Sequence, residues 1–195
     1  MASIFNYVLC KIKERFVIFI SLIITFLVGF LLGLFFNLPE VLREFYTSFV
    51  FEIFTNVLLA NTSIFNFLFL RIINLILLYL IAFLLSLNFI SFFGVFIMVF
   101  YRSYVLAVAL KICAITLTFG GIIPFIFTVF LESLIVTFSL IIYAVLSYKS
   151  LQNKRSNFLE KQLKKTTICL LLGVVGIVAE CLLLACVFRP INFYF

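Results

Sequence analysis

Five long hydrophobic runs, separated by stretches that carry most of the charged residues, limit what this 195-residue chain can fold into. Each is close to the ~20 apolar residues that an α-helix needs to cross the hydrocarbon core of a bilayer. Hydrophobic residues make up 67% of the chain, which leaves too few polar residues to cover a water-soluble domain. We therefore expect one integral membrane domain over residues 1–195, an all-α helical bundle with about five transmembrane spans. The expected spans are residues 16–36, 64–87, 90–110, 122–145 and 167–187.

The basic residues predict how the chain is oriented in the membrane. Nine of the 14 Lys and Arg residues lie in two segments, 11–15 and 149–165. With five spans, both segments fall on the same side of the membrane. Because Lys and Arg concentrate in cytoplasmic loops, we expect the N-terminus inside and the C-terminus outside. Residues 149–166 are interpreted as a basic, solvated hairpin.

The segment after the first span, "PEVLREFYTSFVFEIFTNVL" at residues 39–58, has the pattern of an amphipathic helix. Acidic residues and hydroxyls such as Glu40 and Glu44 recur at helical spacing, and apolar residues such as Phe45 and Phe49 line the opposite side. We expect a helix that lies on the outer membrane surface or caps the bundle. Two roles remain open for it, a connector packed on its own protein and a docking surface for an extracytoplasmic partner.

Four charged residues lie within the hydrophobic runs: Arg71, Arg102, Glu132 and Glu180. Counting a helical rise of about 1.5 Å per residue puts Arg102, Glu132 and Glu180 at nearly the same depth, slightly past the midplane. An isolated charge there costs at least ~2.5 kcal/mol, so we expect Arg102 to pair with Glu180 and Glu132. Arg71 comes out nearer the outer headgroups, which its side chain could reach, and is taken as the weakest member. Such a cluster is either a brace for the bundle or a polar binding site open to the outer face.

Two pairs of glycines predict close helix packing. Gly29 and Gly33 form a GxxxG pattern in the first span, which allows a close crossing within the chain or between copies in a homo-oligomer. Gly173 and Gly176 share a helical face with Glu180 in the last span. A neighbouring helix is expected to approach closely just beneath that carboxylate.

The composition argues against several classes of function. The chain has no His, and all seven of its acidic residues are Glu, so the usual catalytic dyads and triads of membrane hydrolases cannot be built. Phosphate-binding and metalloprotease motifs are absent as well, and we expect no enzyme activity and no cofactor. The scattered cysteines form no CxxC and predict neither a metal site nor a disulfide framework: Cys10, Cys113, Cys169, Cys181 and Cys186. The net charge of +7 is explained by membrane orientation, without a nucleic-acid partner.

Three stretches resemble the bacterial stage II sporulation protein M family of small multi-spanning membrane proteins. "YVLCKIKERFVIFISLIITFLVGFLLG" (residues 7–33) is similar to its opening, a basic start followed by a span with paired glycines. "YRSYVLAVALKICAITLTFGGIIPFIFTVFLESLIVTFSLIIYA" (101–144) is similar to its central region, and "VAECLLLACVFRP" (178–190) to its ending. The lysine-rich hairpin fits too, and Arg102 and Glu180 map onto the pattern. Two positions depart from the pattern. Ser103 stands where the family often has glycine after the basic residue. Residues 131–133 read "LES", where many members have proline followed by a polar pair.

The resemblance implies a non-enzymatic scaffold in the bacterial cytoplasmic membrane. In endospore formers such a protein holds cell-wall hydrolases at the septal membrane during engulfment. A second hypothesis is a transport component, in which the Arg/Glu cluster forms part of a substrate or proton pathway. A third is a structural subunit of a larger transporter that meets an ATPase through residues 149–166.

Overall fold

The structure is a computed structural model that describes residues 15–36, 64–116, 126–152 and 158–188, and every element in these ranges is helical. Five of the helices are long and apolar enough to cross a membrane. The predicted class, an all-α multi-pass membrane bundle, is confirmed. The predicted amphipathic helix at 39–58 lies outside the described residues. The five long helices are α2 (Phe16–Phe35), α4 (Ile64–Leu85), α5 (Phe89–Thr116), α7 (Leu131–Gln152) and α8 (Phe158–Leu183).

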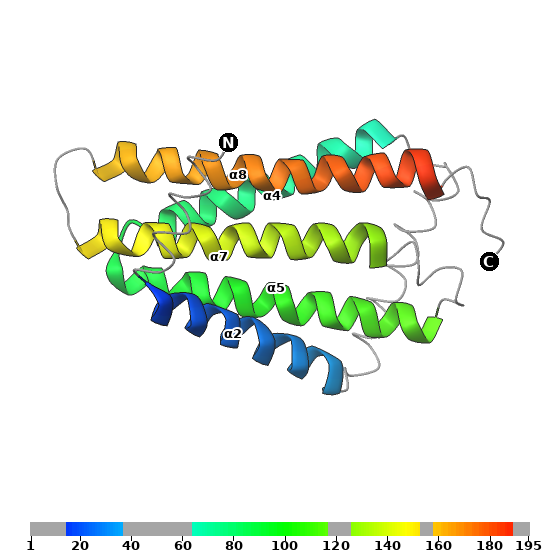
Figure 1. Ribbon diagram of the computed structural model, residues 1–195, viewed down its shortest axis with the longest axis horizontal. Coiled ribbons are helices and arrows are strands. Elements are labelled where there is room, and N and C mark those ends of the chain that lie inside the picture. Colours follow the sequence, from blue (N-terminus) through cyan, green and yellow to red (C-terminus); the bar gives the residue numbers. More distant parts are fainter. Residues whose placement is uncertain (1–14, 37–63, 117–125, 153–157, 189–195) are drawn as a thin grey trace.

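The helices lie side by side, with α2 against α5, α5 against α7, and α7 against α8 (Figure 1). Helix α4 crosses α8 and packs on it (Figure 1). In the most apolar 18-residue stretch of α7, 61% of the residues are buried, whereas the corresponding share is 17% in α2 and in α4. Helix α7 is therefore the enclosed member of the bundle, and α2 and α4 are the least buried of the five long helices.

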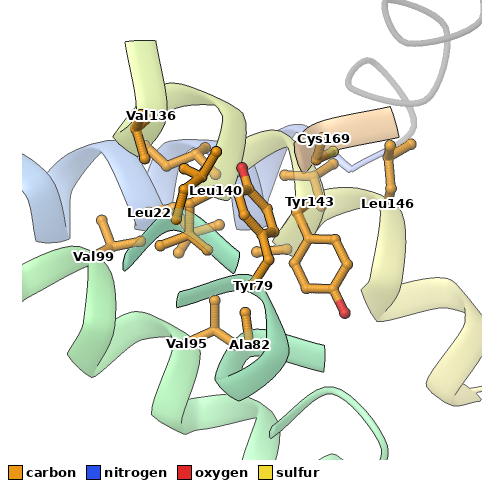
Figure 2. Packing of buried hydrophobic residues seen from close by; sticks show 14 of the residues in the cluster. Leu22, Tyr79, Ala82, Val95, Val99, Val136, Leu140, Tyr143, Leu146 and Cys169 are labelled. Carbon is orange, nitrogen blue, oxygen red and sulfur yellow. The ribbon is translucent and has the colours of Figure 1, made fainter. Parts of the chain in front are cut away.

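The core lies where α7 meets its neighbours. Val136, Leu140 and Tyr143 of α7 are fully buried, and Tyr79 of α4 packs edge-to-face on Tyr143 with ring centroids 6.1 Å apart (Figure 2). Leu22 of α2 reaches the same cluster (Figure 2). In lipid there is no hydrophobic force between helices, so this close packing and the contacts of small residues hold the bundle together.

The GxxxG pattern of α2 is used inside the chain. A Cβ added to Gly33 would lie 2.5 Å from the Tyr104 carbonyl oxygen of α5, and one added to Gly29 would lie 2.6 Å from the Phe100 carbonyl oxygen. The Ser103 hydroxyl also contacts Gly29, and it donates to the Phe100 carbonyl at 2.8 Å. The two glycines thus let α2 approach the backbone of α5.

Several boundaries differ from the predicted ones. Helix α5 is continuous past Arg102 and extends to Thr116. A short π-helical segment, η1 (Ile126–Phe130), precedes α7, and another, η2 (Leu184–Phe188), follows α8.

Residues 149–166, interpreted as a basic, solvated hairpin, are helical in their described part, because α7 runs to Gln152 and α8 begins at Phe158. Glu160, Lys161 and Lys164 are exposed there, as expected. Gln162 is fully buried, and Lys165 donates to the Leu146 carbonyl at 2.9 Å. The expectation of a solvated surface therefore fails at these two residues, whose side chains hydrogen-bond to Ser86 and to Leu146 of α7.

Candidate functional site

An ion pair between Arg71 and Glu180 is the centre of the candidate site. The Arg71 Nη2 atom donates to Glu180 Oε1 at 3.1 Å, which joins α4 to α8. The Glu180 side chain is 0% exposed, whereas that of Arg71 is 29% exposed. The carboxylate therefore has no access to solvent or lipid, and its charge is compensated by the guanidinium of one neighbouring helix.

This pairing corrects the prediction that Arg71 is the weakest member of the cluster. Instead of extending to the headgroups, its guanidinium turns inward and lies over the Phe67 ring, 5.2 Å from the centroid. Phe67 stands one helical turn before Arg71, so its ring covers the arginine on the same face of α4. The helix crossing brings Arg71 and Glu180 to one level, which counting residues along each helix did not detect.

Glu132 and Arg102 lie near the Arg71–Glu180 pair without forming a salt bridge to it. Glu132 is buried in the first turn of α7, where the Ser133 hydroxyl donates to its Oε2 at 3.1 Å. Its negative charge acts on both Arg71 and Arg102. Among the described residues no salt bridge joins Arg102 directly to Glu132 or Glu180, so the predicted direct pairing of Arg102 with these glutamates is wrong. The site combines two guanidinium groups with two carboxylates, formally without net charge.

Two polar atoms of the central pair keep unused hydrogen-bonding capacity. Glu180 Oε2 and Arg71 Nε are buried and have no hydrogen-bond partner among the described residues. Both glutamates also lie near π-helical segments, Glu132 just after η1 and Glu180 one turn before η2. Single π-helical turns often occur at functional sites. The pair thus has one donor and one acceptor that a polar ligand or a water could use.

The glycines of α8 position this pair from below. A Cβ on Gly173 would lie 2.9 Å from Leu75 of α4, and one on Gly176 would lie 3.0 Å from Ile135 of α7. Both glycines therefore allow side chains of adjacent helices to pack directly beneath Glu180, as the sequence indicated. Gly173 and Gly176 thus make room for side chains of neighbouring helices, whereas Gly29 and Gly33 make room for the backbone of α5.

A second polar layer, closer to the end of the bundle where α7 ends and α8 begins, was missed in the sequence. Tyr79 hydrogen-bonds Ser139, and Tyr143 hydrogen-bonds Ser86 with 2.6 Å between their oxygens. Gln162 Nε2 donates to the same Ser86 hydroxyl at 2.9 Å. Tyr, Ser and Gln are common within apolar runs and form no motif, so only the register between helices could have revealed their contacts.

The hydroxyls of this layer are fixed in place. Ser139 donates to the Val136 carbonyl at 2.9 Å, and Ser86 donates to the Phe83 carbonyl at 2.8 Å. Each serine proton is therefore committed to its own helix, and Tyr79 and Tyr143 must act as donors to the serines. A chain of hydroxyls with committed protons stabilises helix contacts and is a poor relay for protons.

The described residues contain no group of three or more Cys and Glu that could hold a metal ion. The site therefore offers charge and hydrogen bonds, without an evident place for a metal.

No protein-family model matches this chain, and no curated protein or solved structure matches it either. The likeness to stage II sporulation protein M therefore rests on the sequence patterns described above. What the structure shows is an all-α multi-pass membrane protein with a buried Arg–Glu pair between α4 and α8.

Proposed function

We propose that the chain is a non-enzymatic membrane scaffold that holds extracytoplasmic cell-wall hydrolases at the cytoplasmic membrane of a bacterium. The observation that carries the scaffold role is the enclosed Arg71–Glu180 pair, with Glu180 completely shielded. An acid that releases or accepts a transported ion must exchange with water, whereas an acid that braces two helices is best kept dry. The hydrolase partners are supported by the family resemblance alone.

The other polar contacts support the same role. Gly29 and Gly33 are occupied by α5, and the serine hydroxyls of the inner layer are committed to backbone carbonyls. These contacts fix the helices relative to one another. A fixed bundle suits a protein that presents a surface to partners and does not alternate between two open states.

The scaffold is tested by photo-crosslinking from the outer segment, residues 40–60, in intact cells, followed by identification of the captured proteins. We expect wall hydrolases, and we expect Glu180→Gln to retain most of the capture, because an amide oxygen at that position still accepts from Arg71. The matched control is Glu160→Gln, an exposed glutamate on the same helix. Capture of no extracytoplasmic protein would sink the proposal.

A transport component is the second candidate, favoured by the unused atoms Glu180 Oε2 and Arg71 Nε beside two π-helical segments. Purified protein in liposomes with an imposed pH or ion gradient separates the two. Transport requires a flux that Glu180→Gln abolishes and Glu160→Gln preserves. A scaffold gives no flux above protein-free liposomes in any of the three samples.

A further inference from the structure

Asn74 is a polar residue in the middle of a lipid-facing helix. It is the eleventh of the 22 residues of α4, about 15 Å along the helix from Ile64. Its side chain is exposed, and it makes no hydrogen bond to any described residue. In a helix that spans a ~30 Å hydrocarbon core, this position is close to the bilayer midplane.

A carboxamide at that depth needs a partner. It has two N–H donors and a carbonyl acceptor, and the hydrocarbon offers neither water nor any other polar group. Other polar side chains on exposed helix faces satisfy themselves locally: Ser21 donates to the Val17 carbonyl at 2.8 Å, and Thr167 donates to the Leu163 carbonyl at 3.0 Å. Asn74 makes no such local bond, so its amide is available to another helix.

The surface around Asn74 is suited to helix packing. Leu70, Ile73, Leu77 and Ile81 follow one another at spacings of three or four residues and form an exposed apolar ridge beside the amide. The nearest charge on α4 is Arg71, which is engaged with Glu180. A helix that packs on this ridge therefore meets apolar side chains and one amide.

We propose that the partner is a second copy of this chain, with α4 packed on α4 and the two Asn74 amides hydrogen-bonded to each other. A carboxamide is self-complementary, because it can donate and accept in the same pair. A two-fold axis along the membrane normal places residue 74 opposite residue 74. Two copies with the same topology also hold this residue at the same depth, so no separate match of depth is needed. The dimer goes beyond the scaffold role and does not depend on it.

The test measures dimerisation in liposomes across a series of protein-to-lipid ratios, by Förster transfer between labelled copies. Interhelical hydrogen bonds in membranes are worth about 0.6–2 kcal/mol, so we expect Asn74→Leu to weaken the dimer roughly 3- to 30-fold. Asn74→Gln should retain most of the affinity, because it keeps the amide. The matched control is Asn66→Leu, an exposed asparagine in the first turn of α4, where headgroups and water are within reach.

A second measurement covers the case in which Asn74→Leu folds poorly. For this measurement the exposed Cys186 and also Cys10, which lies outside the described residues, are replaced by Ser. Molecular iodine, which partitions into hydrocarbon and oxidises neutral thiols, should then join two copies of Ile73→Cys on the ridge through a disulfide, with release of two HI. Tyr101→Cys, on an exposed face of α5, should give none. The proposal is overturned if the unsubstituted chain stays monomeric at all ratios, or if Asn74→Leu dimerises as tightly as the unsubstituted chain. Equal losses for Asn74→Leu and Asn66→Leu, or a crosslink from Tyr101→Cys and none from Ile73→Cys, would overturn it as well.

Discussion

Arg71 and Glu180 meet at 3.1 Å between α4 and α8, with the carboxylate fully enclosed and the guanidinium partly exposed. The glutamate has lost all of its solvation, and the arginine provides the compensating charge. Removing one member of such a pair leaves an uncompensated buried group, which is more damaging than removing both. The difference in stability between single and double variants therefore tests whether the pair braces the helices.

The single substitution Arg71→Leu should lower the free energy of unfolding by about 3 kcal/mol, because it leaves Glu180 buried without a cation. The double substitution Arg71→Leu with Glu180→Leu should recover most of that loss, since neither polar group remains. The measurement is reversible unfolding in micelles, followed by circular dichroism. The exposed Lys164–Glu160 pair on α8 is the control, and Lys164→Leu should change stability by less than about 1 kcal/mol. Additive losses in the double variant would show that the pair does not brace the helices.

The α2–α5 contact should be intolerant of a single methyl group. Gly29→Ala and Gly33→Ala each place a Cβ about 2.5 Å from a carbonyl oxygen of α5, and a backbone cannot move aside as a side chain can. We expect each substitution to lower the unfolding free energy by about 1–3 kcal/mol, despite the better helix propensity of alanine. Unfolding in micelles checks this.

Gly173→Ala is the matched control for these two variants. Its Cβ would meet the Leu75 Cδ1 atom at 2.9 Å, and the end of that side chain can rotate. We expect a change within about 1 kcal/mol of the unsubstituted protein. A control that is as damaging as Gly29→Ala would contradict the distinction between backbone and side-chain contacts.

The sequence predicted the helices well because length and hydropathy are properties of each segment alone. Helix α2 begins at Phe16 as predicted, and it ends at Phe35, one residue before the predicted end. Contacts between helices depend on crossing angles and rotations, which no single segment contains. Depth counting therefore grouped Arg102 with Glu180, whereas the crossing of α4 over α8 brings Arg71 there instead.

The glycines also show that a single segment does not reveal which helix will contact it. Their small size predicted close approach, and the structure has close approach at all four positions. Which helix approaches is another matter, because GxxxG patterns serve contacts within a chain and between chains alike. Gln162 is the extreme case, since its polarity placed it in a solvated hairpin and only the packing of α8 on α7 buries it.

The distribution of basic residues predicts that the N-terminal end of α8 faces the cytoplasm. The Lys164 side chain is 71% exposed there. In a chain with Cys10 and the exposed Cys186 replaced by Ser, Lys164→Cys in intact cells should react with a membrane-impermeant maleimide only after the membrane is permeabilised. Tyr101→Cys, in the middle of α5, should stay unlabelled in both conditions because thiols in hydrocarbon do not ionise. Labelling of Lys164→Cys in intact cells would reverse the assigned topology.

Gln162 should be replaceable by an apolar residue at little cost. Its Nε2 atom donates to Ser86, but its Oε1 atom is buried without a hydrogen-bond partner in the described part of the chain. Gln162→Met removes that unsatisfied acceptor, and Ser86 still accepts from Tyr143. We expect the unfolding free energy to stay unchanged or to rise by about 1 kcal/mol, whereas Tyr143→Phe should lower it by about 1 kcal/mol. Lys164→Met, on the exposed face of α8, controls for the introduced methionine. A loss above 2 kcal/mol for Gln162→Met alone would mean that Oε1 holds a bound water or ligand that stabilises the bundle.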